Sequence, residues 1–263
     1  MIEIRNVSKS FGSLHVLRGV SLTIETGQNL VVLGRSGTGK SVLLKLIIGL
    51  LPLDDGEILV DGQSVHRLAH RELDELRQRM GMLFQMSALF DSMTVGENVG
   101  LALKEHTAMS PPEIADVVEE KLRMVGLEGI AGKRPSDLSG GMRKRVSLAR
   151  AISRNPDYIL YDEPTTGLDP ITSAQIDQLI RELQARLEIT SVVVTHDLKS
   201  AFTVGDRFCL LSEGRIIFDG SKREIQESQD PAVRQFLTGE PSGPLTDQTA
   251  PHRRKRTKVP IWS

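Results

Sequence analysis

Short apolar runs recur along the first third of the chain, and most of them have the length of β-strands. Residues 2–7 and 19–24 alternate between apolar and polar positions, as half-buried strands do. Residues 30–33 are continuously apolar, which is typical of a strand covered on both faces. Two further strands, at 57–62 and 80–85, and a charged helix at about 69–79 complete this part. The pattern predicts a strand-rich core over residues 1–85.

The apolar spacing changes after residue 85. Three segments, 94–103, 112–125 and 142–154, repeat their apolar residues at the period of a helix, with no strand pattern between them. We therefore expect a helical lobe over residues 86–154, inserted into a core that resumes at residue 155.

Strand patterns return in the last third of the chain. Apolar runs at 157–162 and 191–195 are separated by a helical pattern over about 172–187, and strands at 207–211 and 215–218 follow. Strands that are apolar on both faces and alternate with helices indicate a parallel sheet covered on both sides. The expected fold is therefore α/β, with a core formed by residues 1–85 and 155–239.

The end of the chain differs in composition from the rest. Pro, Ser, Gly and Thr dominate from residue 240, and residues 252–258 form a basic run. This composition predicts a flexible basic tail over residues 240–263. The basic run could contact anionic lipid headgroups or a partner chain, or have no role as a solvated end.

Composition narrows the classes of function. The 263-residue chain is 39% hydrophobic and 25% charged, enough for a full core and an ordinary surface. A net charge of −1 and an aromatic content of 4% argue against a nucleic-acid partner. A single cysteine excludes an internal disulfide, and neither a signal peptide nor a membrane-spanning run is recognisable. A soluble cytosolic protein is expected, which could still dock on a membrane protein.

A glycine-rich loop follows the apolar run 30–33 and precedes a helical pattern. It consists of Gly34, Arg35, Ser36, Gly37, Thr38, Gly39, Lys40 and Ser41, and matches the phosphate-binding pattern G-x4-G-K-S. The glycines let backbone N–H groups surround phosphate oxygens, and the helix N-terminus adds partial positive charge. Lys40 is expected to reach the β- and γ-phosphates, and the Ser41 hydroxyl to ligate Mg2+. A glycine turn without a ligand is the alternative.

Two adjacent acidic residues end the apolar run 157–162. Ligands of open α/β sheets bind at the carboxyl ends of strands, where Asp162 and Glu163 are predicted to lie. Asp162 is expected to hold Mg2+, and Glu163 to orient and deprotonate an attacking water. Such a pair can also simply begin a turn, but the preceding phosphate loop favours hydrolysis.

A second glycine-rich turn leads directly into a helix. Leu138 is followed by Ser139, Gly140 and Gly141, which offer another set of N–H groups at a positive helix end. Ser139 could be an ordinary helix cap. The first glycine-rich loop already supplies one phosphate-binding site. A second set of N–H groups at a helix N-terminus therefore requires a separate function.

The order of these motifs resembles that of ATP-binding-cassette (ABC) ATPases over roughly residues 1–238. The resemblance implies a P-loop NTPase core with a mixed sheet, an N-terminal antiparallel β-subdomain and an inserted helical subdomain. It also implies that ATP is held between two head-to-tail copies of the chain, with Ser139, Gly140 and Gly141 of one copy closing on the γ-phosphate bound by the other.

The same resemblance implies roles at four further positions. Phe11 matches an aromatic residue that stacks on adenine, although a lone Phe in a loop more often packs in a satellite of the hydrophobic core. Gln85 matches a glutamine that joins the Mg2+ and water site to the helical lobe, and Asp169 a loop that couples the two sites. His196 matches a histidine at the γ-phosphate, although a lone His after a strand is more often a surface residue. Met142 departs from the usual glutamine, and we expect catalysis to survive.

Several less specific segments resemble the ATPase subunits of MCE-associated, Mla-type phospholipid transport systems. They are the stretches 86–95, 104–107, 169–173 and 231–237. This implies an inner-membrane permease that docks on residues 85–95, an MCE protein, and in some members a STAS-domain protein, with the ATPase peripheral on the cytoplasmic face. Met86, Leu89 and Phe90 are expected to be exposed for docking, with burial inside the lobe as the alternative.

Two other functions stay open at this point. The chain could be the ATPase of an importer for a polar solute, or a soluble ABC ATPase acting on ribosomes or DNA. The second class usually has two cassettes in one chain or a long coiled-coil insertion, and this chain has neither.

Overall fold

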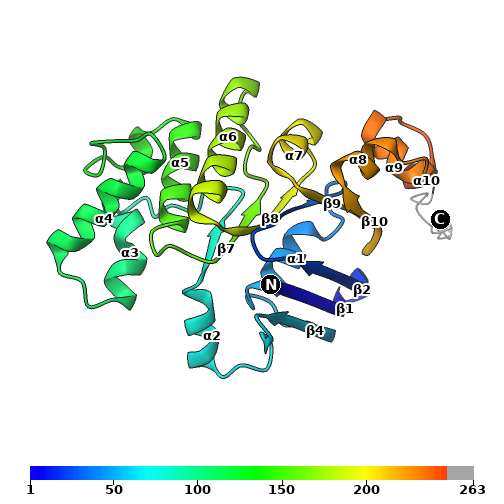
Figure 1. Ribbon diagram of the computed structural model, residues 1–263, viewed down its shortest axis with the longest axis horizontal. Helices are drawn as coiled ribbons and strands as arrows, with labels where there is room; N and C mark the ends of the chain where they lie inside the picture. Colours follow the sequence, from blue (N-terminus) through cyan, green and yellow to red (C-terminus); the bar gives the residue numbers. More distant parts are fainter. Residues whose placement is uncertain (248–263) are drawn as a thin grey trace, which may run out of the picture.

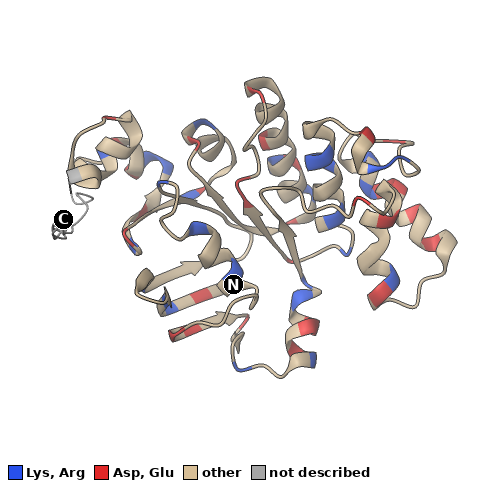
Figure 2. Ribbon diagram, turned by 180° about the vertical axis from the view of Figure 1, so that it is seen from behind, with Lys and Arg blue, Asp and Glu red and all other residues tan. Residues whose placement is uncertain are grey.

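The computed structural model describes residues 1–247. Figure 1 shows a central sheet with a helical lobe at one end and the C-terminal helices at the other. Figure 2 shows Lys and Arg distributed among Asp and Glu over the whole of this arrangement. None of the helices in the described part of the chain is both long and apolar enough to cross a bilayer.

The central sheet has six strands in the order β10-β9-β3-β8-β7-β6. Strands β3, β6, β7, β8 and β9 are parallel, and β10 is antiparallel to β9. The strands are β3 (Asn29–Leu33), β6 (Met80–Leu83), β7 (Tyr158–Asp162), β8 (Thr190–Thr195), β9 (Arg207–Ser212) and β10 (Arg215–Ser221). The α/β fold with a mixed sheet is confirmed.

The two faces of this sheet contribute to two separate cores. Along β3, Val31 and Leu33 pack into a core with the helices of the lobe and with the helices that cover this face of the sheet. Leu30 and Val32 point the other way, into a core with α1 (Lys40–Ile47) and the N-terminal sheet. This alternation explains why the strand is apolar at every position.

The N-terminal sheet is antiparallel and has four strands in the order β2-β1-β4-β5. They are β1 (Ile2–Phe11), β2 (Leu14–Ile24), β4 (Asp55–Val60) and β5 (Gln63–Ser64). The apolar pattern of the sequence predicts that Phe11 lies in a loop between two short strands. That was wrong, because β1 continues to Phe11 and pairs with Leu14 across a tight turn at Gly12, whose φ is +59°.

The inserted lobe is helical, as the apolar period predicts. It contains α3 (Val95–His106), α4 (Pro111–Met124), the short 3-10 turn Pro135–Asp137 and α5 (Gly140–Ala151). Thr94 caps α3 by accepting from the Glu97 amide, while the Glu97 carboxylate accepts from the Thr94 amide. Helix α5 contacts α3 and α4, and also β6 and α6 (Pro170–Leu187) of the core. It therefore joins the lobe to the sheet.

The remaining helices are α2 (His70–Arg77), α7 (Leu198–Val204), α8 (Lys222–Glu227), α9 (Pro231–Thr238) and α10 (Pro244–Asp247). The patterns did not predict α7 to α10. The Gln235 side chain accepts from the Leu245 amide at 2.7 Å and donates to Thr246, which fastens α10 to α9. The folded chain thus continues to Asp247, past the predicted start of the tail, and the basic run 252–258 lies outside the described residues.

Candidate active site

The phosphate loop joins the carboxyl end of β3 to the N-terminus of α1. A Cβ atom on Gly34 would lie 2.5 Å from the Leu211 carbonyl oxygen, so the neighbouring strand leaves no room for a side chain. Gly39 has φ +103°, a backbone conformation that favours glycine, immediately before Lys40 begins α1. The loop therefore needs both glycines to turn from strand to helix.

Lys40 is held inside this loop. Its ammonium donates to the carbonyl oxygens of Gly34 and Arg35 at 2.8 and 3.1 Å, and lies 3.5 Å from Glu163 Oε1. Burial lowers the pKa of Lys40, although the nearby Glu163 and Asp162 carboxylates oppose this. The loop carbonyls thus keep a partly desolvated positive charge where phosphate oxygens are expected.

Asp162 and Ser41 meet at the same edge of the sheet. The Ser41 hydroxyl donates to Asp162 Oδ1 at 2.7 Å, and burial raises the pKa of Asp162. Both residues offer oxygen atoms, the ligand type that Mg2+ prefers, and both adjoin the phosphate loop. These two oxygen-bearing side chains would suit a magnesium ion beside bound phosphates.

Glu163 follows β7 with a strained backbone and a well-bonded side chain. Its φ of +48° is unusual for a residue other than glycine, and its amide continues the sheet by donating to the Val194 carbonyl at 2.9 Å. The hydroxyls of Thr166 and Thr195 donate to Oε2 at 3.2 and 3.3 Å, and His196 Nδ1 lies 3.0 Å from Oε1. The carboxylate is therefore buried and oriented toward Lys40 and His196.

Lys144 belongs to the site as well, although the sequence motifs do not identify it. Its ammonium, on α5, donates to the Gln85 carbonyl at 2.6 Å and to the Glu163 carbonyl at 3.5 Å. Burial lowers the pKa of Lys144 to about 8. Helical spacing was the available signal, because Lys144 stands four residues before the buried Leu148. Through Lys144 the structure connects Gln85, whose own side chain is exposed, to Glu163.

The second glycine turn lies at the start of α5. Ser139 caps this helix by accepting from the Met142 amide at 3.2 Å, and a Cβ on Gly141 would lie 2.6 Å from Thr172 of α6. Asp169 caps α6 by accepting from Ile171 and Thr172 amides at 3.0 Å. Within residues 1–247, none of Ser139, Gly140, Gly141 and Asp169 has a hydrogen bond to the phosphate loop of the same chain.

A hollow of about 690 Å³ opens beside the phosphate loop. Its lining includes Leu14 and Val16 of β2, the loop residues Arg35, Ser36, Gly37 and Thr38, and Leu245. Phe11 does not line it, but lies nearby in the β1–β2 hairpin with 46% of its surface exposed and the Lys9 ammonium 5.4 Å from its ring. Leu14 and Val16 were not predicted, because their exposure depends on where the hairpin turns.

The segment after Gln85 is only partly exposed. Met86 and Phe90 are 88% and 50% exposed, as expected. Leu89 instead packs against the core of the lobe, so the expectation that it is exposed was wrong. A groove of about 510 Å³ lies beside this segment, lined in part by Leu50, Phe84, Ala88, Phe90, Ala102 and His106.

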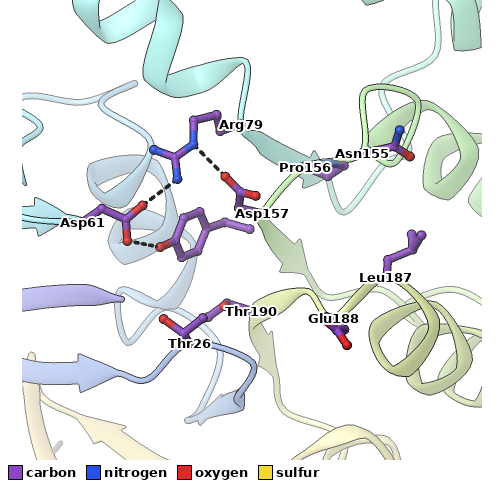
Figure 3. A pocket seen from close by; sticks show the side chains of 10 residues that line it. Thr26, Asp61, Arg79, Asn155, Pro156, Asp157, Leu187, Glu188 and Thr190 are labelled. Atoms are coloured by element: carbon purple, nitrogen blue, oxygen red, sulfur yellow. Dashed lines mark hydrogen bonds and ion pairs between the residues drawn. The ribbon is translucent and has the colours of Figure 1, made fainter.

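A second polar cluster lies at the opposite, amino edge of the sheet (Figure 3). Arg79 donates to Asp157 Oδ2 at 2.6 Å and to Asp61 Oδ2 at 2.7 Å, and the Tyr158 hydroxyl donates to Asp61. Burial would raise the pKa of Asp61, but hydrogen bonds from the Met1 amine, Tyr158 and Arg79 lower it to about 2. These contacts tie the N-terminal sheet to β6 and β7.

Comparison with known proteins decides the family. The family model described as "ABC transporter" matches residues 17–166, which include the phosphate loop, Ser139 to Gly141, and the Asp162–Glu163 pair. The chain belongs to the ABC ATPase family.

Solved ABC cassettes share its fold. The dimeric, post-hydrolysis ATP-binding cassette MJ0796 bound to ADP and Pi is 36% identical, with a TM-score of 0.78 over 84% of this chain and 98% of that one. The cbiO1 subunit of Clostridium perfringens is 28% identical, with a TM-score of 0.79 over 90% of this chain and 94% of that one. The chain is therefore an ATP-binding and ATP-hydrolysing enzyme of this fold.

Curated relatives are more similar still. The ATP-binding protein MlaF of the intermembrane phospholipid transport system of Haemophilus influenzae is 43% identical over 93% of both chains. MlaF of Escherichia coli K12 is 42% identical over 93% of this chain and 91% of its own length. The probable ribonucleotide transport ATP-binding protein mkl of Mycobacterium tuberculosis is 45% identical over 93% of this chain and 68% of its own. The expected resemblance to Mla-type ATPases is confirmed.

Proposed function

We propose that this ABC ATPase is the motor subunit of a transporter that moves phospholipids between the inner and outer membranes. The observation that carries the proposal is its similarity to MlaF over 93% of both chains. The name of the mkl protein instead points to ribonucleotides. Phospholipid is preferred because the match to MlaF extends over nearly the whole of both proteins, while mkl is matched over 68% of its length.

ATP binds between the aromatic face of Phe11 and the phosphate loop. The N–H groups of the loop and the Lys40 ammonium hold the β- and γ-phosphates, and Lys40 leaves its carbonyl partners for phosphate oxygens. Ser41, Asp162 and Gln85 would hold Mg2+, which supplies positive charge to the phosphates when bound.

Hydrolysis uses the buried carboxylate of Glu163 as general base. Glu163 accepts a proton from the water that attacks the γ-phosphate, and Thr166 and Thr195 keep its carboxylate oriented. His196, now beside Glu163, and Lys40 stabilise the negative charge that develops on the phosphoryl oxygens. Preorganised charge of this kind needs little rearrangement during the reaction.

Two copies of the chain complete each other's sites. Among the described residues, Ser139, Gly140 and Gly141 have no hydrogen bond to their own phosphate loop, and in Figure 1 α5 belongs to the lobe while α1 lies beneath the central sheet. In a head-to-tail dimer the N-terminus of α5 from one copy faces the γ-phosphate held by the other, and Asp169 couples the two sites. The dimeric MJ0796 cassette supports this arrangement.

The permease docks at the junction of core and lobe. The groove beside residues 85–95 combines exposed apolar side chains, Leu50 and Phe90, with the segment that begins at Gln85. The proposed partner of this surface is an apolar helix of an inner-membrane permease, with the ATPase peripheral on the cytoplasmic face. An MCE protein belongs to the same proposal, and a STAS-domain subunit is an optional member of the complex.

Purification of the native membrane complex tests the cargo and the partners together. The complex is extracted with the full chain as bait, its subunits are identified, and its bound molecules are analysed by mass spectrometry. The proposal expects a permease, an MCE protein and enriched phospholipid. Recovery of ribonucleotide, of a polar solute with a periplasmic binding protein, or of ribosomes without a permease would contradict it.

A further inference from the structure

One face of α5 presents a row of hydrogen-bond donors to the segment 85–88. The donors are Lys144, Ser147 and Arg150, which are spaced by three residues and therefore lie along one side of the helix. Lys144 bonds the Gln85 carbonyl at 2.6 Å, and the Ser147 hydroxyl bonds the Ser87 carbonyl at 2.9 Å. The Arg150 guanidinium bonds the carbonyls of Ser87 and Ala88 at 2.9 and 2.6 Å.

The segment that accepts these bonds has a strained backbone. Ser87 and Ala88 have φ values of +63° and +49°, a left-handed conformation that is unfavourable for residues other than glycine. Two such residues in succession persist only where surrounding contacts hold them. The row of donors on α5 supplies those contacts, since Ser87 is buried and its carbonyl would otherwise be deprived of partners.

The row begins at the catalytic residues. Besides the Gln85 carbonyl, Lys144 reaches the carbonyl of Glu163, whose own φ of +48° also needs support. One buried ammonium therefore fixes the backbones of both Gln85 and Glu163. At its other end the row reaches Ala88 and Arg150, which line the groove beside the segment.

We infer that Lys144, Ser147 and Arg150 are positioning residues for ATP hydrolysis, which hold Gln85 at a fixed place relative to Glu163. Because Ser139 caps the same helix, a movement of α5 when two copies close on ATP moves the segment 85–88 with it. The further link from this segment to a permease in the groove rests on the proposed function.

The test compares ATP turnover of purified full-length variants. Lys144→Met and Arg150→Met each remove a charged donor and keep an apolar stem. We expect kcat to fall about tenfold, because a hydrogen bond from a charged donor is lost, with KM for ATP changed less than about twofold. Lys144→Arg and Arg150→Lys, which restore a charged donor, should recover most of kcat.

Arg145→Met is the matched control. Arg145 is half-buried on the same helix, like Arg150, but donates to the Val125 carbonyl and to Gln175 at 3.1 Å, away from residues 85–88. Its kcat should stay within about twofold of the unchanged protein. An equal loss of kcat in this control, or a lower melting temperature without any loss of kcat in Arg150→Met, would overturn the inference.

A milder variant covers the case in which Arg150→Met does not fold. Ser147→Ala removes one neutral hydroxyl. We expect amide hydrogen exchange over residues 85–89 to be faster than in the unchanged protein, while exchange over α4 stays the same. Unchanged exchange there would also refute the inference. ATP turnover and hydrogen exchange are both measured on this chain alone. Absence of a permease from the native complex would therefore refute the proposed function without affecting the inference about α5.

Discussion

Charged side chains cluster at both edges of the six-stranded sheet, but their environments differ. At the carboxyl edge, burial lowers the pKa of Lys40 and raises that of Asp162, so both charges are disfavoured by their surroundings. At the amino edge, Arg79 bridges two carboxylates that remain partly open to solvent, and the pKa of Asp61 falls to about 2. One cluster holds charges that lack ideal partners, while in the other each charge is matched.

This difference separates a site for a ligand from a structural link. Unfavourable burial and a left-handed Glu163 reduce stability, and such costs persist where a substrate or ion completes the arrangement. The matched amino-edge cluster leaves nothing for a ligand to supply and instead joins two sheets. Four substitutions can break or sharpen this comparison.

Glu163→Gln should have the largest effect. The amide keeps the shape of the side chain but cannot accept the proton of the attacking water, so kcat is expected to fall by about 10²–10⁴ while ATP binding persists. Steady-state ATPase assays and nucleotide titration measure the two quantities. Asp157→Asn at the amino edge is the control, with kcat unchanged, and turnover of Glu163→Gln at the normal rate would refute the role of Glu163.

Lys40→Met should uncouple affinity from stability. Loss of the ammonium is expected to weaken ATP binding at least tenfold, since a charge-assisted contact to phosphate disappears. The stability of the nucleotide-free protein should change by no more than about 1 kcal/mol, because removal of a buried charge is favourable while loss of the Glu163 ion pair is unfavourable. Calorimetry and denaturant unfolding provide the two readouts. A loss of about 3 kcal/mol or more would show that Lys40 is held as a matched structural ion pair, and that the two edges do not differ as described.

Asp177 tests whether burial alone makes a carboxylate functional. This residue of α6 accepts from the Ser200 hydroxyl, and burial raises its pKa to about 6, above the ordinary 3.8. The folded state therefore binds this proton more tightly than the unfolded state, and ionisation lowers stability as pH rises from about 4 to 6. Asp177→Asn should stabilise the protein at pH 7 by on the order of 2 kcal/mol and remove this slope.

Turnover distinguishes Asp177 from Asp162. Because Asp177 lies outside the candidate site, kcat of Asp177→Asn should equal that of the unchanged protein. Urea unfolding at pH 4 and pH 7 measures the stability difference. Equal stabilisation at both pH values would show that folding does not raise the pKa of this carboxyl.

Arg79→Ala should have the smallest effect, on stability alone. The folded Asp61 has a lowered pKa, so its contribution is present above about pH 4 and is lost as pH falls toward 2. Because Arg79 and its partners are partly exposed, solvent screening limits the loss to about 1 kcal/mol at pH 7. Unfolding curves at pH 3 and pH 7 should show a smaller pH dependence than in the unchanged protein, and any change in kcat would count against a structural role.

The sequence predicted the carboxyl edge far better than the amino edge. A phosphate loop and an acidic pair have fixed residue types at local spacing, so Lys40, Ser41, Asp162 and Glu163 could be placed before any contact was known. Asp61, Arg79 and Asp157 come from separate turns, and only the pairing of two sheets brings them together. Local sequence patterns do not show which residues from separate turns come into contact when two sheets pack together.

Side-chain direction was the other quantity that patterns left undetermined. Lys144 and Arg143 follow one another on α5, yet one is buried against Gln85 and the other exposed, because only one faces the sheet. Leu89 turned inward for the same reason, since the left-handed residues Ser87 and Ala88 redirect the chain just before it. Tertiary packing fixes these orientations.

Cross-linking between two copies most directly tests the central claim that each chain completes its partner's nucleotide site. Ser36→Cys and Ser139→Cys are introduced together into the Glu163→Gln variant. Cys209, the only cysteine of the natural sequence, is fully buried and should not react. A short bifunctional thiol reagent should join two chains through these positions when ATP is present, and not without nucleotide. Absence of the ATP-dependent product, or a cross-link formed only within one chain, would contradict the account.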